Sequence, residues 1–464
     1  MKESIDKNKV ISNIFAYSVY DSRGWPTVAC KVSVGRVHAT AMIPSGASTG
    51  EKEAVELRDG DEKVLFGKTV NKAVRNINNK IAPKLIGYFA VDQQRKIDEL
   101  LIVLDGTNNK SKLGANAILA VSLACAKCAA KVLKKPLYKY LGQNVAKVKT
   151  NDYLQPVPML NVINGGAHAD NTIDFQEFLI LPTGAKNIIQ ALQMSSQVFH
   201  SLEKVLKSKN MNTNKGDEGG FAPNGLCSAE EVFDLLMLAV KEANLIPGKD
   251  IWFAIDAAAS ELYDKKTKMY IFKKALRANL IDEDAAQLTT AQMIKYWKKL
   301  VSKYPIISIE DGLDENDWEG FQILLKEIGN SVQIVGDDVF CTNPSLIAAG
   351  IKTNIANAVL IKVNQVGTLS ETVMSIKNAI AAGWGYIISH RSGETEDDFI
   401  ADLAIGLGGG QVKFGSMSRS ERIAKYNRLI SINYELGKLA HYRGLQTFKN
   451  IDLKTRTTHK ISKF

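Results

Sequence analysis

Cysteines and long apolar runs are both scarce in this sequence of 464 residues. Five cysteines cannot form the dense disulfide framework of small secreted domains, so we expect reduced thiols. No apolar run approaches the roughly 20 residues that a membrane-spanning helix requires. Residues 1–9 contain lysines and acids where a secretory signal would have its apolar core. Together these absences predict a cytoplasmic protein that is not an integral membrane protein.

Blocks of like charge are also missing from most of the chain. The formal net charge is +10, but the lysines are spread along the sequence, which does not favour nucleic acid as an obligate partner. A diffuse positive field suits a small anionic substrate instead. The exception is the basic stretch at residues 452–464, which we interpret as a tail appended to the folded domains.

The sequence does have the composition of a globular protein, with 45% hydrophobic and 23% charged residues. Thr27–Val34 and Val37–Ile43 alternate apolar or small residues with polar ones, which predicts a β-hairpin. A loop rich in glycine and hydroxyl side chains follows at Ser45–Gly50. Leu113–Ala130 is apolar on nearly every side and should form a buried helix. Residues 1–145 are therefore predicted to form an N-terminal α+β domain.

Residues 146–451 contain short apolar runs that are separated by stretches of helical composition from the third run onward. Such runs are typical of a parallel sheet covered by helices. Eight of them over roughly 300 residues predict a closed (β/α)8 barrel, with a doubly wound open sheet as the alternative topology. The runs are Val157–Val162, Phe175–Leu181, Ile251–Ile255, Ile306–Ile309, Val332–Val335, Ala358–Val363, Tyr386–Ser389 and Gln411–Val412.

Polar residues stand at or next to the ends of these runs, and those from Glu310 onward are spaced by 23 to 28 residues, about one strand and one helix. In a barrel, residues at such positions converge on one rim, where active sites form. We interpret Gln176 and Glu177 in the same way, as residues that follow a strand. The set is Gln176, Glu177, Asp256, Glu310, Asp337, Lys362, His390, Arg391 and Lys413.

Asp256, Glu310 and Asp337 occupy the same point of three strands. Each alone would be interpreted as a helix cap, but clustered carboxylates repel one another unless a cation lies among them. An all-oxygen site with open positions suits Mg²⁺. The positive charges that follow along the chain predict an anionic ligand, and Arg391 with Ser392 would suit its phosphate.

Lys362 lies at the end of an apolar run. An ammonium in a buried strand is costly, so we expect a lowered pKa and a role as a base. The alternative is a lysine whose ammonium reaches water from the strand end. Glu218 lies in the glycine-rich segment Gly216–Pro223. Together with Glu177 it is one of two candidate carboxyl groups. Two carboxyl groups facing a lysine across a metal site provide the acid and base that proton abstraction beside a carboxylate requires.

Eight motifs occur in order along the chain: Asp21–Gly24, Ser45–Gly50, Leu113–Asn116, Asn164–Ala169, Gly216–Gly220, Ser308–Asp311, Leu360–Gln365 and Ser389–Asp397. Through them the sequence resembles the enolases, or phosphopyruvate hydratases, of bacterial type from Val10 to Ile451. The resemblance implies an N-terminal α+β domain and a (β/α)8 barrel, residues 146–451, whose first connections depart from simple βα order. It also implies a glycolytic lyase that interconverts 2-phosphoglycerate and phosphoenolpyruvate.

The resemblance also implies a role for individual catalytic residues. Lys362 would remove the proton from C2, and Glu218, supported by Glu177, would protonate the departing C3 hydroxyl, with His390 in the same catalytic set. Loss of a proton beside a carboxylate builds up a dianionic ene-diolate, and divalent cations offset that charge.

Binding residues follow from the same resemblance. Two Mg²⁺ ions are implied. Asp256, Glu310 and Asp337 would hold the first, and Ser48 in the lid would help to hold the second. The residues that would bind substrate are His168, Gln176, Glu177, His390, Arg391, Ser392 and Lys413.

The sequence departs from the family pattern at four places. Trp25 stands where Asn is usual, and Phe414–Met417 differs beside Lys413, where we expect a local change without loss of activity. Ala29 and Ser431 replace a Glu and an Arg that pair across the enolase dimer. The resemblance implies a homodimer or higher homo-oligomer, and in this sequence the dimer contact would lack this ion pair.

Two alternative functions remain. One is another Mg²⁺-dependent lyase or racemase on the same barrel, which Glu218 and the Ser45–Gly50 lid argue against. The other is a binding role at the cell surface, in addition to or instead of catalysis, with a secondary cell-surface pool and surface ligands. The basic tail at 452–464 permits this second role without supporting it.

Overall fold

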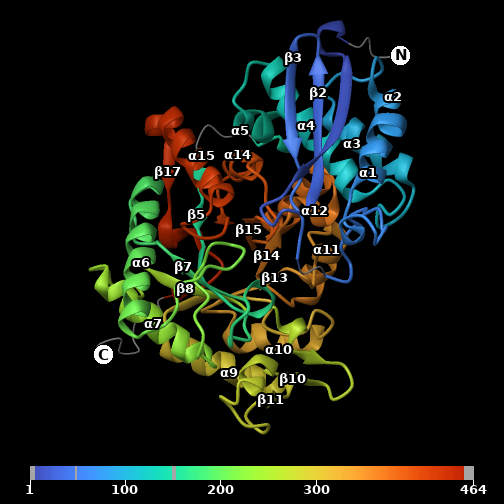
Figure 1. The fold of residues 1–464 in the computed structure, drawn as a ribbon. Helices are drawn as coiled ribbons and strands as arrows, with labels where there is room; N and C mark the ends of the chain where they lie inside the picture. Colours follow the sequence, from blue (N-terminus) through green and yellow to red (C-terminus); the bar gives the residue numbers. More distant parts are fainter. Residues whose placement is uncertain (1–5, 48–49, 149–152, 454–464) are drawn as a thin grey trace.

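The computed structural model describes residues 6–47, 50–148 and 153–453. It places an N-terminal α+β region above a barrel formed by the later part of the chain (Figure 1). Three antiparallel strands form the N-terminal sheet in the order β1-β2-β3. The predicted hairpin is confirmed as β2 (Pro26–Val34) and β3 (Val37–Met42). The remaining strand, β1 (Asn13–Tyr20), was not predicted, and it pairs with β2.

Helix α4 (Ala115–Val132) is the core helix of the N-terminal region, as predicted. It packs against β2 and β3. Among the helices of the described residues, α4 alone is long and apolar enough to cross a membrane, but 83% of it is buried inside the protein. Burial of an all-round apolar helix against a sheet accounts for that composition. The other helices of this region are α1 (Asn71–Asn76), α2 (Ala82–Leu85), α3 (Gln94–Asp105) and α5 (Leu137–Tyr140).

Nine strands of the described chain form the barrel sheet, in the order β5-β16-β15-β14-β13-β12-β8-β7-β6. The two end strands are β5 (Val157–Pro158) and β6 (Leu160–Asn164), and only Met159 separates them along the chain. The sheet thus closes through one continuous stretch, as a barrel does and an open sheet does not. The others are β7 (Glu177–Leu181), β8 (Trp252–Asp256), β12 (Ile306–Glu310), β13 (Gln333–Gly336), β14 (Ala358–Ile361), β15 (Gly385–Ser389) and β16 (Gln411–Lys413).

The first connections of the barrel depart from simple βα order. Strand β7 runs antiparallel to both β6 and β8, whereas the other neighbouring pairs are parallel. Both α6 (Ile188–Ser208) and α7 (Ala229–Glu242) lie between β7 and β8. Later strands are separated mainly by single long helices. These are α9 (Thr290–Lys303), α10 (Trp318–Ile328), α11 (Pro344–Thr353), α13 (Leu369–Ala381) and α14 (Phe399–Gly406), and α15 (Ser420–Leu436) follows β16.

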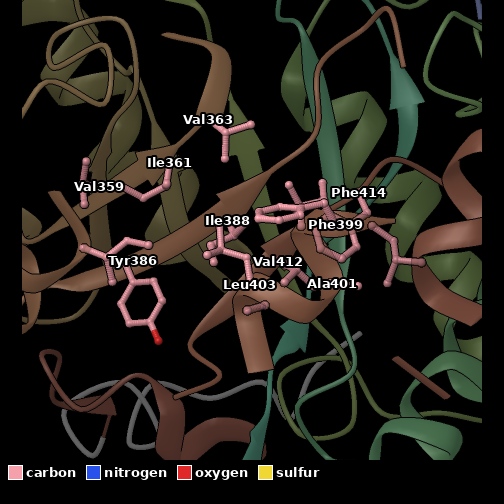
Figure 2. Close-up of a cluster of buried hydrophobic side chains, with 14 of the residues drawn as sticks. Val359, Ile361, Val363, Tyr386, Ile388, Phe399, Ala401, Leu403, Val412 and Phe414 are labelled. Carbon is pink, nitrogen blue, oxygen red and sulfur yellow. The ribbon is translucent and has the colours of Figure 1, made fainter. Parts of the chain in front are cut away.

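Side chains along the barrel strands alternate between two apolar cores. In β14, Ala358 and Leu360 belong to the cluster inside the barrel, whereas Val359 and Ile361 belong to the cluster outside it. Figure 2 shows part of the outer cluster, where side chains of β14, β15 and β16 gather with those of α14. Both faces of the strands are therefore buried, which explains their continuous apolar runs.

The C-terminal segment closes the lower end of the barrel, by which we mean the end where the parallel strands begin. Phe448 and Ile451 belong to the inner cluster together with Trp252, the first residue of β8. The Asp452 N–H donates to the Asn330 carbonyl at 2.7 Å. The predicted tail at 452–464 thus begins with a residue bonded to the barrel, and its residues 454–464 lie outside the described chain.

Candidate active site

Six polar side chains mark the upper rim of the barrel, where the parallel strands end. They follow strands that neighbour one another in the sheet, so the predicted convergence on one rim is confirmed. They are Asp256 at the end of β8, Glu310 at the end of β12, Asp337 after β13, Lys362 after β14, His390 after β15 and Lys413 at the end of β16.

Glu177 reaches the same rim by a different route. We expected it to follow a strand, which is wrong, because it is the first residue of β7. Since β7 is antiparallel to its neighbours, Glu177 pairs with Asp256, the last residue of β8. Gln176 precedes it, and its Nε2 lies 3.4 Å from Asp256 Oδ2 as a donor. The reversed direction of β7 therefore brings both side chains to the rim.

One cavity at this rim is lined by all of the predicted catalytic and substrate-binding residues. Ion pairs among them leave a free volume of about 10 Å³, room for about one water molecule. The lining comprises His168, Gln176, Glu177, Glu218, Lys362, His390, Arg391, Ser392 and Lys413, together with Ser389, which was not predicted.

The ammonium of Lys413 lies among carboxylates. Its Nζ is 2.8 Å from Asp256 Oδ2, 2.9 Å from Glu310 Oε1 and 3.2 Å from Glu177 Oε2. Burial favours the neutral amine, but these charges outweigh it and raise the pKa of Lys413 well above its usual value. Burial and the Asp256 charge raise the pKa of Glu310. These carboxylates therefore need positive charge, and their oxygen donors suit Mg²⁺.

Lys362 donates a short hydrogen bond from its ammonium to Asp337. The second oxygen of that carboxylate, Oδ1, accepts from Gln365 Nε2 at 2.9 Å. Burial lowers the pKa of Lys362, but the Asp337 charge outweighs burial and raises it overall. Our expectation of a lowered pKa is thus wrong for the protein without its ligands, because Asp337 compensates for burial. The alternative of an ammonium in water also fails, since the side chain is only 13% exposed and paired.

Asp337 also belongs to a second cluster of acids. With Asp311 and Asp338 it forms a group whose ligand atoms lie within 4.8 Å of one another. Asp311 accepts from the N–H groups of Asp337 at 2.9 Å and Asp338 at 2.8 Å, and its own φ is +42°. Burial and the Asp337 charge raise the pKa of Asp338 to about 8. Asp311 therefore positions the predicted ligand Asp337, and the cluster is electrostatically suited to a cation.

Glu177 and Glu218 are buried carboxyl groups with opposite tendencies. Burial, reinforced by the charge of Glu218, raises the pKa of Glu177 well above its usual value. Burial acts on Glu218 in the same direction, but His390 and His168 outweigh it and lower the pKa of Glu218. His168 Nδ1 lies 3.6 Å from Glu177 Oε1 and 3.7 Å from Glu218 Oε1. The two neighbouring carboxyl groups therefore have pKa values shifted in opposite directions, as in pairs that divide the roles of acid and base.

Arg422 fixes the tautomer of His390. It is fully buried, and its Nη1 lies 2.6 Å from His390 Nδ1. A guanidinium only donates, so Nδ1 accepts and the neutral ring carries its proton on Nε2. This Nε2 faces Glu218, 3.3 Å from Oε2, and Asn161 Nδ2 donates to the same oxygen at 2.9 Å. Burial, helped by the Arg422 charge, lowers the pKa of His390 to about 4, which keeps the ring neutral at pH 7.

The predicted phosphate-binding residues are engaged by the N-terminal region. Arg391 forms a two-pronged ion pair with Glu53, with Nη1 3.0 Å from Oε2 and Nη2 3.2 Å from Oε1. Ser392 Oγ accepts from the Ala47 N–H at 2.7 Å. An incoming phosphate must therefore replace the Glu53 carboxylate at Arg391. The predicted metal ligand Ser48, in the same loop, lies outside the described residues.

Sequence reasoning missed four residues that shape this site: Arg422, Asp311, Glu53 and Asn161. Asp311 could have been found, because it directly follows Glu310 in a recognised motif. Arg422 contacts His390, which lies 32 residues earlier in the sequence. Arg422 is fully buried, and the hydrophobic periodicity of a sequence does not reveal a buried arginine. Only the fold brings these side chains together.

Comparisons with known proteins identify the family to which the chain is similar. Residues 11–141 match the family described as "Enolase, N-terminal domain" and residues 152–451 match "Enolase, C-terminal TIM barrel domain". The chain is 61% identical to the enolase of Malacoplasma penetrans over 444 residues, 95% of this chain and 98% of that protein. It is 60% identical to the enolase of Mycoplasma pneumoniae over 442 residues, 95% of this chain and 96% of that protein.

Proposed function

The chain belongs to the enolase family and is a glycolytic lyase, a phosphopyruvate hydratase, and from this premise we propose which side chains carry out its reaction. The reaction converts 2-phosphoglycerate to phosphoenolpyruvate and back. One observation carries the assignment: a single buried cavity gathers Lys362, two carboxyl groups whose pKa values are shifted in opposite directions, and the cationic side chains of Arg391 and Lys413.

Lys362 is the proposed base for the C2 proton. It can accept that proton only as a neutral amine, so a further positive charge must offset Asp337, which now holds its ammonium. Asp256, Glu310 and Asp337 would hold one Mg²⁺, and Ser48 would help to hold a second. When bound, the metal supplies positive charge beside the substrate carboxylate. A lysine base working with Mg²⁺ is established for the enolase superfamily.

Glu218 and Glu177 are the proposed acid pair of the second step. The C3–O bond breaks as the hydroxyl receives a proton and leaves as water. We place this proton on the pair as a unit, because the two carboxyl groups share His168 as a neighbour and have pKa values shifted in opposite directions. His390 keeps its Nε2 proton toward Glu218 and so orients that carboxyl group.

The remaining residues of the cavity would hold the substrate. Arg391 and Ser392 would bind the phosphate once Glu53 releases the guanidinium. Lys413 would bind the substrate carboxylate, and His168 and Gln176 line the same cavity. On binding, Arg391 would exchange its ion pair with Glu53, and Lys413 its ion pairs with carboxylates of the rim, for contacts with the substrate.

An assay for phosphoenolpyruvate formation from 2-phosphoglycerate, with and without a chelator, tests the whole proposal. We expect formation with Mg²⁺, loss after chelation and recovery when Mg²⁺ is restored. Absence of turnover with Mg²⁺ would contradict the function. Full turnover in chelator would contradict the metal assignment alone.

We infer that the chain forms a homodimer or higher homo-oligomer without the usual ion pair. Ala29 is fully buried, and Ser431 Oγ bonds within its own helix to Glu435 at 3.4 Å. Light scattering of the purified protein at low and high salt would test this, because an interface that lacks the pair should not weaken as salt rises. A cytoplasmic location and a secondary cell-surface pool stay predictions.

A further inference from the structure

Gln365 contacts parts of the candidate active site that come from distant segments of the chain. It lies in the short helix α12 (Val363–Val366), one turn after Lys362, and its N–H donates to the Lys362 carbonyl at 3.0 Å. The side chain is 1% exposed and does not line the active-site cavity. Any effect of Gln365 on a ligand in that cavity must therefore pass through its neighbours.

Both polar atoms of the Gln365 carboxamide have partners. Nε2 donates to Asp337 Oδ1 at 2.9 Å and to Glu53 Oε1 at 3.2 Å. Because an amide –NH₂ group has two N–H bonds, one nitrogen can hold both carboxylates. Oε1 accepts from the Thr342 hydroxyl at 2.6 Å, and the same hydroxyl oxygen accepts from the Lys362 N–H at 2.9 Å. The contact with Thr342 thus fixes the orientation of the amide.

The two carboxylates that Gln365 holds belong to different binding sites. Asp337 is a proposed ligand of the first Mg²⁺, and its other oxygen holds the ammonium of Lys362. Glu53 forms the ion pair with the Arg391 guanidinium, where the substrate phosphate is proposed to bind. An unbroken path of hydrogen bonds, with Gln365 at its centre, therefore joins the phosphate site to the first metal site.

Glu53 needs other donors once a phosphate has taken Arg391. Its side chain is 8% exposed, and a buried carboxylate that loses its ion pair is costly. Two donors besides Arg391 contact its Oε1, the Gly50 N–H and Gln365 Nε2, each at 3.2 Å. Hydrogen bonds to an ionised acceptor are stronger than those between neutral groups. Gln365 should therefore stabilise Glu53 more after Arg391 has bound the phosphate than before.

We propose that Gln365 is a positioning residue that couples the phosphate site to the first metal site. It supports Glu53 when the phosphate takes Arg391, and it orients Asp337 toward the cation. The inference rests on the proposed function, because it uses the roles assigned to Arg391 and Asp337. It adds that a single amide, which touches neither ligand, contributes to the affinity of the protein for both.

Gln365→Met tests this role because it removes the amide and keeps an unbranched side chain of similar length. With a chelator present, calorimetric titration of inorganic phosphate should show binding about tenfold weaker than in the original protein, because Glu53 has lost a donor. Titration of Mg²⁺ alone, without phosphate or substrate, should also show binding about tenfold weaker, because Asp337 is less firmly oriented. Neither measurement depends on turnover.

Glu53→Gln separates the two effects. In this variant no carboxylate competes for Arg391, so phosphate should bind about tenfold more tightly than in the original protein. When Gln365→Met is added to Glu53→Gln, phosphate binding should change by less than about twofold, whereas Mg²⁺ binding should still weaken about tenfold. A general disturbance of the fold by Gln365→Met would weaken phosphate binding equally with and without Glu53→Gln.

Gln333→Met is the matched control. Gln333 is 0% exposed, is the first residue of β13, and exchanges hydrogen bonds of 3.1 and 2.8 Å with Gln411. It therefore lies at the opposite end of its strand from Asp337. Its replacement should lower the melting temperature, because Gln411 loses its partner, and should leave the phosphate and Mg²⁺ affinities unchanged.

Three outcomes would overturn the proposal. The first is phosphate and Mg²⁺ binding by Gln365→Met that equals binding by the original protein. The second is an equal loss of phosphate binding with and without Glu53→Gln. The third, which needs no change at Gln365, is unchanged phosphate binding in Glu53→Gln alone. Failure of the proposed function would appear differently, as absence of 2-phosphoglycerate turnover by the original protein.

Discussion

The two ends of the barrel are formed by the same strands but bury opposite kinds of side chain. At the upper rim, Glu310 and Lys413 are each 2% exposed and survive burial only because they are paired. At the lower end, Phe448 and Ile451 close an apolar core. Apolar burial stabilises a fold directly, whereas a buried ion pair roughly balances its own desolvation. We therefore expect substitutions at the lower end to change mainly the stability of the fold, and substitutions at the upper rim to change mainly the catalytic activity.

The largest effect should come from Lys362→Ala at the upper rim. Without an amine at this position the C2 proton has no base, so exchange of that proton with solvent should fall by about 10⁴-fold. Mg²⁺-dependent binding of substrate should persist, because the phosphate and carboxylate contacts remain. Proton exchange measured by NMR tests the step separately from turnover.

Lys438→Ala, an exposed lysine of the same charge, is the control for Lys362→Ala and should exchange normally. Retained exchange in Lys362→Ala would remove the base assignment.

Phe448→Ala should show the reverse pattern at the lower end. Its ring is 2% exposed in the inner core, so truncation should lower the free energy of unfolding by about 3–5 kcal/mol. The turnover number per folded molecule should stay within about twofold, since Phe448 lies at the other end of the barrel from the rim residues. Urea unfolding and kcat on the same samples test both halves. A loss of kcat with unchanged stability would break the contrast between the two ends.

Glu218→Gln should separate the two chemical steps. Glutamine keeps the shape of the side chain but supplies no acid, so dehydration should slow by about 10²-fold or more while C2 exchange is affected less. The ratio of exchange to product formation is the quantity to measure. If exchange fell as much as dehydration, Glu218 would belong to the first step.

The sequence predicts which residues lie at strand ends, but it does not predict the direction of a strand or which side chains meet in space. Strand ends are marked locally, so Glu310 and Lys413 could be assigned to one rim from the spacing of the residues between them. Strand direction is not marked locally, and for this reason Glu177 was placed at the wrong end of its strand. The pKa of Lys362 depends on which partner is nearest in space, and that partner, Asp337, comes from another strand.

The smallest effect should distinguish Arg422→Gln from Arg422→Leu. Both remove the charge that helps to lower the pKa of His390 to about 4, so that pKa should move toward its ordinary value of 6.5. Only Gln can still donate to Nδ1 and keep the proton on Nε2, so kcat at pH 8 should be about tenfold higher in Gln than in Leu. The pH profile of kcat tests the effect of the Arg422 charge, and the difference in kcat between the two variants tests the tautomer of His390.

The sign of the pH effect on His390 follows from its lowered pKa. Between pH 6.5 and about 4 the unfolded chain binds a proton at this ring and the folded protein does not, so the ring makes stability fall as the pH falls. In both Arg422 variants this contribution should shrink, while kcat should decline below pH 6.5, where the original protein keeps a neutral ring. Identical acid limbs in the variants and the original protein would show that Arg422 only supports the fold.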